Sequence, residues 1–249
     1  MTKLYLPLSI FCLFTSFLLL PVVKAGPHFT KAVVHTTTTA NTTALSEKEK
    51  VETAANAIYD SLELDEIGLN RTAMIYAYEG QQKLEKEGKI SNEDVLTVCD
   101  FSQPSDKKRM YIIDVKNYRV LLNTYVAHGK NSGVEYAERF SNRPESLQSS
   151  LGFYVTKQTY FGKHGLSLRL SGLEKGINDK AEARAVVVHG ASYIGSQRLS
   201  APYMGRSFGC PAVPQQLASK VINLIKDGSA LFIYHPSQKY LQGSTILNG

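Results

Sequence analysis

The sequence predicts one mainly β domain of the α+β class, with a mainly antiparallel sheet, one embedded helix and a helical segment in front. Three observations predict it. About seven short β-rich runs follow one another, turn-forming residues separate them, and one helical pattern lies before the last run. The chain has 249 residues, enough for one large domain with a substantial core, and its charged fraction of 20% excludes wholesale disorder.

The first 25 residues are expected to lie outside the fold as a targeting segment. Lys3 precedes an almost wholly apolar run from Leu4 to Val23, and Val23-Lys24-Ala25 has the small-x-small pattern of a cleavage site. This pattern predicts a signal peptide in residues 1–25 and a secreted, periplasmic or cell-envelope location. The run is also long enough to span a bilayer, so an uncleaved anchor is the alternative and would be the chain's membrane contact.

Residues 26–45 are expected to form a Thr-rich tether that leads into a helix. The tether contains the run 36–43, which has no apolar periodicity and cannot pack. Ser46 and Glu49 form a capping box in front of apolar residues at helical spacing, which predicts that a helix starts at Ser46.

A second helix is predicted from Asn70 to Glu87, because Asn70 can cap its start and Gly88 can end it. Together the two helices form a helical support segment over residues 46–90, which we expect to pack against the β-rich part of the chain. The β-rich runs come after this segment, so we place the main domain at residues 91–240.

The main domain is expected to consist of short strands and one helix. Lys116-Asn117 joins the second and third β-rich runs as a hairpin. Leu217 to Asp227 carries apolar residues on one face and stops at Gly228, which predicts the embedded helix. The predicted strands are residues 95–99, 110–115, 119–126, 152–156, 166–170, 185–188 and 231–234.

Charge and motif content exclude several classes of function. The net charge is +6, and two of these charges, Lys3 and Lys24, lie in the targeting segment. A modest charge without basic clusters excludes a nucleic-acid partner and suits a polyanionic surface such as a cell wall. The sequence also lacks the H-E-x-x-H, C-x-x-C, G-x-S-x-G and phosphate-loop motifs.

Cys210 is the residue best placed to carry chemistry. It lies in the run Gly205-Arg206-Ser207-Phe208-Gly209-Cys210-Pro211, whose glycines allow sharp turns and close approach of a substrate. A loop of this kind exposes the thiol and presents neighbouring N–H groups on one side, as an oxyanion hole requires. Arg206 is expected to add positive potential, which favours a thiolate or binds a substrate carboxylate.

Two other interpretations of the cysteines stay open. Cys210 could be a small buried hydrophobic residue, or it could form a disulfide with Cys99 in an oxidising compartment. Cys99 lies within a predicted strand and is expected to face the core. The Gly-flanked, Arg-adjacent loop of a secreted chain favours a nucleophile at Cys210, and a disulfide would abolish that nucleophile.

A nucleophilic cysteine needs a base, and His189 is the best candidate. It ends the apolar run 185–188 and precedes Gly190, so we expect its ring to be fixed in position and to face the loops. It precedes Cys210 by 21 residues, which is enough for the chain to leave the sheet in one loop and return beside it.

Two further histidines, His128 and His164, are also followed by glycine. They are expected either to line a substrate groove or to satisfy local backbone groups. With His189 they could instead form a metal site, but the spacings are long and no other residue pattern supports it, so no metal is expected.

The run from His189-Gly190 to Ser207-Phe208-Gly209-Cys210 resembles the signature of the L,D-transpeptidases, bacterial cell-wall enzymes with a Cys nucleophile. From about Ser46 to Tyr234 the chain resembles one branch of murein L,D-transpeptidase catalytic-domain proteins. Phe208 stands where the common motif has a second His, and Pro211-Ala212-Val213 stand where it often has Arg or Asn. The shared stretches are Asp100-Phe101-Ser102, Val126-Ala127-His128-Gly129-Lys130-Asn131-Ser132-Gly133, Phe140-Ser141-Asn142, Ser149-Ser150-Leu151-Gly152 and Gly165-Leu166-Ser167-Leu168-Arg169-Leu170.

The resemblance implies an L,D-transpeptidase-like mixed or antiparallel β-sandwich and makes residues 91–240 the catalytic domain. It implies that Cys210 is the nucleophile and that His189 activates it. The main-chain carbonyl of Gly190 would orient the imidazole, so that no Asp or Glu is required.

The implied substrate is the tetrapeptide stem of peptidoglycan. The thiolate would attack the diaminopimelate carbonyl, terminal D-Ala would leave, and an amine of another stem would attack the thioester to form a 3→3 cross-link. N–H groups around Ser207, Gly209 and Cys210 would stabilise the oxyanion. No metal or organic cofactor is needed.

The resemblance leaves the acyl acceptor open. Water would make the protein an L,D-carboxypeptidase, a free D-amino acid an exchange enzyme, and a lipoprotein Lys an anchoring enzyme. Two other classes compete with these: another secreted Cys amidase or peptidase, and a non-catalytic cell-wall-binding module with a degenerate site.

Overall fold

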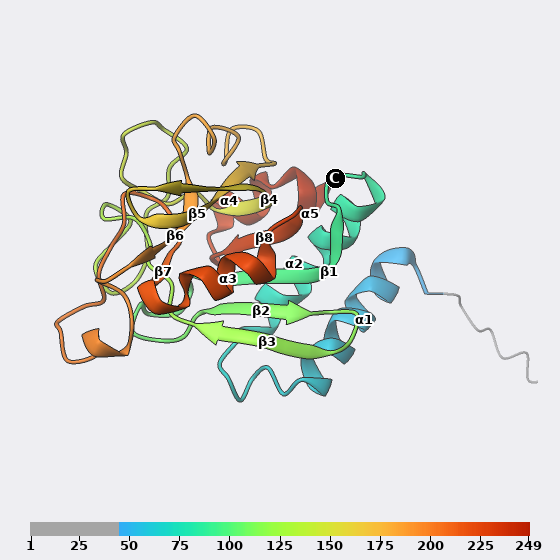
Figure 1. Cartoon of the computed structure of the whole chain (residues 1–249). Helices are drawn as coiled ribbons and strands as arrows, with labels where there is room; N and C mark the ends of the chain where they lie inside the picture. Colours follow the sequence, from blue (N-terminus) through green and yellow to red (C-terminus); the bar gives the residue numbers. More distant parts are fainter. Residues whose placement is uncertain (1–44) are drawn as a thin grey trace, which may run out of the picture. The chain divides into compact units, whose positions relative to one another are not determined.

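One mixed sheet of eight strands organises the described part of the chain, in the order β3-β2-β1-β8-β4-β5-β6-β7 (Figure 1). The computed structural model describes residues 45–249, so the predicted signal peptide and tether lie outside the described residues, apart from residue 45. Neighbouring strands are antiparallel except for the parallel pairs β1–β8 and β6–β7. The strands are β1 Asn92–Asp100, β2 Met110–Asp114, β3 Arg119–Thr124, β4 Gly152–Gly162, β5 Gly165–Gly172, β6 Val187–Ala191, β7 Ala212–Pro214 and β8 Ser229–Tyr234.

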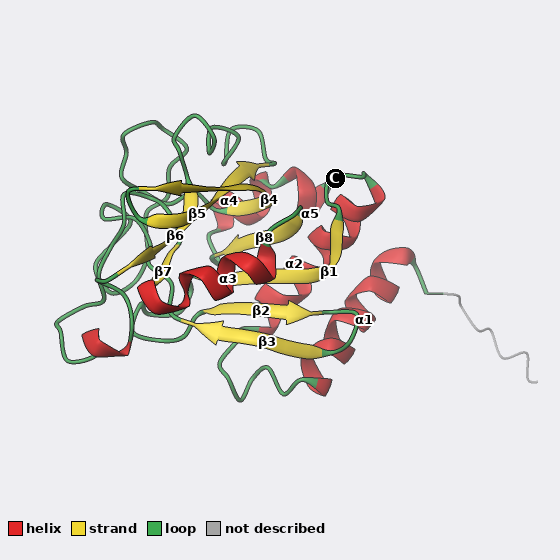
Figure 2. Cartoon of the chain, viewed as in Figure 1, coloured by secondary structure: helices red, strands yellow, loops and turns green. Residues whose placement is uncertain are grey.

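Helices pack around this sheet, and long loops gather on the side away from α1 (Figure 2). The helix predicted over residues 217–227 is α3, and it ends before Gly228 as expected. Short 3-10 turns precede α3 at Gln215–Leu217 and interrupt a loop at Ser196–Arg198. The α-helices of residues 45–249 are α1 Glu47–Ser61, α2 Arg71–Lys86, α3 Ala218–Ile225, α4 Gln238–Gly243 and α5 Thr245–Asn248.

The first two helices begin where their caps predict. At the start of α1, the Ser46 hydroxyl accepts the N–H of Glu49 at 3.2 Å and the Glu49 carboxylate accepts the N–H of Ser46 at 2.7 Å. At the start of α2, the Asn70 side chain accepts the N–H of Ala73 at 3.2 Å. Both sets of bonds satisfy amides that the first helical turn leaves unpaired, which confirms these two predicted helices.

A glycine lets α2 pack closely on the sheet. A Cβ atom at Gly80 would lie 2.0 Å from a ring carbon of Phe153 on β4, so no other residue fits there without moving one of the two elements. The same face of α2 buries Met74, Ala77 and Leu84. The helical segment therefore shares the core of the sheet.

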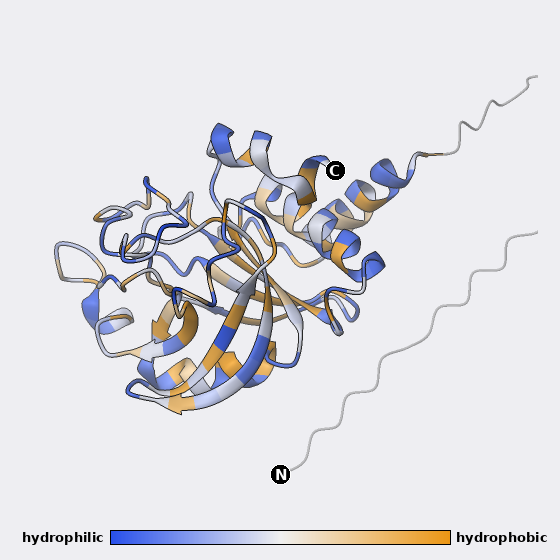
Figure 3. Ribbon diagram, turned by 90° about the horizontal axis from the view of Figure 1, so that it is seen from above, coloured by the Kyte–Doolittle hydropathy of each residue, from blue (hydrophilic) through white to orange (hydrophobic). Residues whose placement is uncertain are grey.

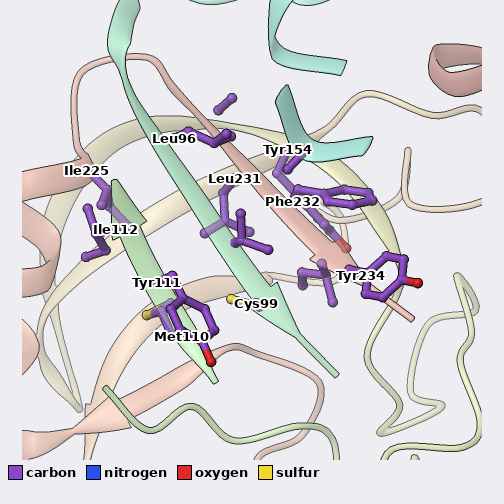
Figure 4. Packing of buried hydrophobic residues seen from close by; sticks show 14 of the residues in the cluster. Leu96, Cys99, Met110, Tyr111, Ile112, Tyr154, Ile225, Leu231, Phe232 and Tyr234 are labelled. Atoms are coloured by element: carbon purple, nitrogen blue, oxygen red, sulfur yellow. The ribbon is translucent and has the colours of Figure 1, made fainter. Parts of the chain in front are cut away.

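Apolar side chains of the central strands form the core. In Figure 3 the strands carry much of the hydrophobic colour, whereas loops and outer helix turns are mostly hydrophilic. β8 is buried along its whole length, as is typical of a strand covered on both faces. Figure 4 shows Cys99 among these side chains, and its paired neighbour across the β1–β2 ladder is Met110. Cys99 is 0% exposed, which confirms the prediction that it faces the core.

The sheet is nearly closed. The chain that leaves β3 crosses to the opposite edge, where the N–H of Ala127 donates to the carbonyl of Ala212 on β7 at 2.8 Å. Gly129 then forms a parallel bridge with Ser207.

The strand order and the helices confirm the predicted mixed, mainly antiparallel sheet with an embedded helix and a helical N-terminal segment. No helix within residues 45–249 is both long and apolar enough to cross a bilayer.

Some predicted boundaries are wrong. The strand expected at residues 185–188 is β6 at Val187–Ala191, because Ala185 has a φ of +51° and cannot continue an extended strand. β7 has three residues and ends in proline, so it lacks the length that a strand pattern needs. The helices after β8 were also not predicted.

Candidate active site

Parallel pairing of β6 with β7 brings the backbone segments that carry the two predicted catalytic residues close together. His189 on β6 lies opposite Ala212 on β7, and Cys210 precedes Ala212 by two residues. The N–H of Val187, two residues before His189, donates to the Cys210 sulfur at 3.5 Å. A short ladder thus brings together two residues that are 21 positions apart in the sequence.

The Cys210 thiol is half-buried and free. Besides accepting from Val187 N–H, its Sγ–H donates to the carbonyl oxygen of Ala185 at 3.7 Å. Ala185 itself has a left-handed backbone, a conformation that costs a non-glycine residue about 1–2 kcal/mol. Because Cys99 is also free, the alternative of a Cys99–Cys210 disulfide does not describe this structure.

Burial raises the pKa of the Cys210 thiol. The N–H of Val187 and the positive charges of Arg184 and Lys163 act in the opposite direction but do not outweigh it. The resting group is therefore a neutral thiol at neutral pH, and a base must remove its proton before it can attack.

The positive charge expected from Arg206 comes instead from Arg184 and Lys163. Arg206 donates from Nη1 to the carbonyls of Lys130 at 3.1 Å and Gly133 at 3.0 Å, and its guanidinium lies 4.6 Å from the ring centre of Tyr203. Arg206 thus ties two loops together. The predicted role of Arg206 beside the thiol is not what its contacts show.

Sequence reasoning missed Arg184. Its guanidinium donates to the carbonyls of Ser141 and Gln148, and Nη2 lies 3.2 Å from the place where a Gly209 Cβ would be. It therefore holds the loop over residues 141–150 against the loop that carries Cys210. No motif marks Arg184, because its partners come from a loop more than thirty residues earlier.

The imidazole of His189 is held in one tautomer. Its Nδ1 lies 2.9 Å from the carbonyl oxygen of Gly190, and a carbonyl can only accept, so Nδ1 carries the proton. The Nε2 lone pair then remains available to a thiol. This is the arrangement that the resemblance implied for His189 and Gly190.

Burial lowers the pKa of His189, although its hydrogen bond to Gly190 opposes the shift. The ring is 4% exposed and stands in the middle of β6, not after its end as the sequence indicated. A neutral imidazole can serve as a general base towards a neutral thiol that comes within its reach.

Two of the three amides expected at the oxyanion are already engaged. The N–H of Ser207 donates to the carbonyl of His128 at 3.0 Å, and the N–H of Gly209 donates to the Ser207 hydroxyl at 3.0 Å. Ser207 in turn donates from its hydroxyl to the carbonyl of Cys210 at 2.6 Å. In this conformation Ser207 and Gly209 therefore shape the loop and do not offer their N–H groups to an oxyanion, contrary to expectation.

Gly209 is required by its backbone. Its φ is +127°, and a Cβ there would lie 2.8 Å from the carbonyl oxygen of Gln148. The glycine thus makes the turn that presents Cys210, as the sequence indicated. Phe208, just before it, is 70% exposed beside the site.

His128 is a structural residue and does not line a groove. It is 0% exposed, and Arg109 donates from Nη2 to its Nδ1 at 2.7 Å. Because arginine is always the donor, Nε2 of His128 carries the proton and faces the carbonyl of Gly133 at 3.4 Å. Burial and the charge of Arg109 lower the pKa of His128 to about 3. The expectation that His128 lines a substrate groove is therefore wrong. The other expectation, that it satisfies local backbone groups, agrees with its contact with the Gly133 carbonyl.

His164 lies at the site. It is exposed at the turn between β4 and β5, and its ring stacks on that of His189 with centres 4.3 Å apart and planes 27° apart. Because His128 is bonded to Arg109 instead, the three histidines do not converge as a metal site. No group of three or more His, Cys, Asp or Glu within residues 45–249 is arranged to hold a metal ion.

Two pockets of the described residues lie away from the candidate site. One has a volume of about 440 Å³ and is lined by residues 88–91, 155–158 and 227–228. The other, of about 290 Å³, is lined by residues including Lys83 and Ile246. Neither pocket is lined by a residue of the candidate site, which is identified instead by the chemistry of Cys210 and His189.

Comparisons with known proteins identify a family that matches most of the chain. A family described as "L,D-transpeptidase catalytic domain" matches residues 65–234. No curated protein matches the chain.

Similar solved structures include an L,D-transpeptidase from Mycobacterium smegmatis, at 13% identity, a TM-score of 0.35, and coverage of 57% of this chain and 59% of that one. L,D-transpeptidase 1 of Mycobacterium tuberculosis is 12% identical with a TM-score of 0.31, over 57% of this chain and 62% of that one. An L,D-transpeptidase from Xylanimonas cellulosilytica is 15% identical with a TM-score of 0.31, and the match covers 74% of this chain and 93% of that one. The chain thus spans about 59% of the length of the first of these structures.

Proposed function

The chain belongs to the L,D-transpeptidase catalytic domain family, and from this premise we propose that it is a peptidoglycan L,D-transpeptidase-like acyltransferase. The proposed reaction cuts the diaminopimelate–D-Ala bond of a tetrapeptide stem through a thioester on Cys210. The observation that carries the proposal is the hydrogen bond from His189 Nδ1–H to the Gly190 carbonyl, which leaves Nε2 to act on the thiol of the neighbouring loop.

Acylation begins with a proton transfer. In the resting arrangement the Cys210 thiol donates to the Ala185 carbonyl, so it must turn towards Nε2 of His189 before it reacts. Nε2 takes the proton as the sulfur attacks the diaminopimelate carbonyl carbon. The imidazolium then protonates the amine of D-Ala as the peptide bond breaks, and a thioester and neutral His189 remain.

Deacylation runs the same transfer in reverse. The side-chain amine of a second stem loses a proton to Nε2 of His189 and attacks the thioester carbonyl. The Cys210 thiolate leaves and recovers that proton, and the product is a 3→3 cross-link. With water as the acceptor the same steps give an L,D-carboxypeptidase.

Fixed charges stabilise the developing negative charge. Arg184 and Lys163 favour the thiolate of Cys210, since both act to lower its pKa. The N–H of Cys210 is the remaining amide of the three expected at the oxyanion, and one such donor is worth about 3 kcal/mol in comparable enzymes. The Gly190 carbonyl stabilises the imidazolium, so an acidic side chain is not needed there.

A product assay tests the proposal. The purified protein is incubated with diaminopimelate-containing tetrapeptide stems, and the products are analysed by mass spectrometry beside a Cys210→Ala control. Release of D-Ala together with cross-linked dimers that depend on Cys210 supports the proposal. Release of D-Ala without dimers favours the L,D-carboxypeptidase alternative.

Two further outcomes identify the competing classes. Cleavage of the stem at another bond favours a different Cys amidase or peptidase. No turnover, together with no adduct after excess carbapenem, favours a non-catalytic cell-wall-binding module.

We also propose that the protein acts in the cell envelope, because its substrate would lie there and residues 1–25 have the pattern of a signal peptide. Fractionation of cells that produce the full chain, or a chain without residues 1–25, tests this. Retention of the full chain in the cytoplasm would contradict it.

A further inference from the structure

A hairpin places a second imidazole on the proposed base. β4 and β5 pair to their tips at Gly162 and Gly165, so Lys163 and His164 form the turn. The ring of His164 lies nearly flat on that of His189, with ring centres 4.3 Å apart. This contact joins the turn of one hairpin to the middle of the next strand.

The His164 ring covers one face of the His189 ring, whose in-plane orientation is already fixed by a hydrogen bond. His189 is 4% exposed, and its Nδ1–H bond to the Gly190 carbonyl fixes the in-plane orientation. That bond alone still lets the His189 ring tilt about the line that joins its Nδ1 to the Gly190 carbonyl oxygen. A flat neighbour at stacking distance opposes the tilt, because the rings would collide.

We propose that His164 is a positioning residue for His189, whose stacked ring sets the plane that aims Nε2 at Cys210 and keeps water from that face. This inference rests on the proposed function and adds a residue to it. His164 transfers no proton in this account, so an apolar flat ring can replace it.

Burial and the charged groups near His189 together set the direction of the pH effect. His164 and Lys163 of the hairpin act on His189. Arg184 acts on Cys210, and Cys210 in turn acts on Tyr193. Burial is the main cause that lowers the pKa of His189, and the charges of His164 and Lys163 add to it.

Removal of the His164 ring therefore exposes His189 and raises its pKa towards the ordinary value. Acylation requires neutral His189, so the acid limb of the rate profile then moves to higher pH.

The test uses three variants of the full chain. His164→Ala removes the ring, and His164→Phe keeps a flat ring without nitrogen atoms. Phe161→Ala is the matched control, because Phe161 lies in the same hairpin and is 84% exposed. For each protein, acylation by a carbapenem is measured against pH, and the ¹⁵N shifts of the His189 ring are titrated by NMR.

We expect His164→Ala to lose on the order of 10- to 100-fold in the second-order acylation rate at neutral pH, as a small misplacement of a catalytic group does. Its acid limb and the His189 titration should move together to higher pH. His164→Phe should recover most of the rate and most of the shift of the acid limb, because it restores burial, the largest cause, but not the smaller effect of the His164 charge. Phe161→Ala should match the wild type.

Two results would overturn the inference. One is a His164→Ala protein with wild-type acylation and an unchanged His189 titration. The other is a His164→Phe protein that behaves like His164→Ala, which would mean that the ring nitrogens of His164 matter and not its shape. If the wild type itself forms no adduct, the proposed function fails, and the NMR titration still decides whether His164 positions His189.

Discussion

Nδ1 of His189 lies 2.9 Å from the carbonyl oxygen of Gly190, its immediate neighbour in the chain. A bond between adjacent residues needs no distant partner, so the tautomer of the base is set by the strand that carries it. Pairing of β6 with β7 then sets how close that base lies to the loop of Cys210. The chemistry of the site therefore depends on one short parallel ladder.

Replacement of the base should slow acylation strongly without unfolding the protein. We expect His189→Gln to lower the rate of carbapenem acylation by roughly 10²- to 10⁴-fold, the usual contribution of a general base. Glutamine can keep a donor near the Gly190 carbonyl, so the fold should persist. Stopped-flow acylation and thermal unfolding check this, and near-normal acylation would remove His189 from the mechanism.

Alkylation of Cys210 should report a protonated thiol. Burial raises its pKa above the ordinary value of 9.0, and burial lowers the pKa of His189, so both groups are neutral at neutral pH. The rate of alkylation by iodoacetamide should therefore be slow at pH 7 and rise through a pKa above 9.0. An alkylation rate that is already maximal near pH 6 would indicate a thiolate–imidazolium pair instead.

The two cysteines should differ in their effect on stability. Cys99 is fully buried in the core, so Cys99→Ser buries a hydroxyl and should lower the free energy of unfolding by about 1–3 kcal/mol. Cys210 lies in a loop, so Cys210→Ser should unfold like the wild type and lose acylation. Urea unfolding of both variants measures this, and a comparable loss of stability at Cys210 would mean that its thiol is a core group.

Arg109 should stabilise the loop behind the nucleophile. Its guanidinium is 0% exposed and donates to the carbonyls of Gln103 and Val126 and to Nδ1 of His128. Arg109→Met leaves these acceptors unpaired, at a cost of about 1–3 kcal/mol for each buried group that finds no other donor.

Because the His128 carbonyl accepts the Ser207 N–H, acylation by Arg109→Met should slow as well. Arg139→Met is the control, since Arg139 is exposed. Urea unfolding and acylation rates of both variants are the measurements. Equal effects in the two variants would show that Arg109 has no special role.

Local signals predicted the parts of this protein that local contacts determine. The caps at Ser46 and Asn70 marked two helices to within a residue, because their partners lie three positions away. Alternation and β-branched residues marked most strands for the same reason. His189 could be proposed as the base for Cys210 from its place in an apolar run and its spacing, and a family resemblance supported the same pairing.

The rest depended on contacts between distant segments. His128 had the same glycine neighbour as His189, yet Arg109 makes it a core residue. The charges near Cys210 come from Arg184 and from Lys163, and neither lies in a motif. β6 shifted because Ala185 takes a left-handed backbone, which alanine rarely does and which no sequence pattern marks.

The central claim is that a stem peptide becomes attached to Cys210. Peptide mapping by mass spectrometry, after rapid quenching of the protein with a tetrapeptide stem and no acceptor, tests it most directly. We expect the stem minus its terminal D-Ala on the peptide that contains Cys210, no such mass on the peptide of Cys99, and no adduct in Cys210→Ala. A stem adduct that survives in Cys210→Ala, or release of D-Ala that does not depend on Cys210, would contradict the account.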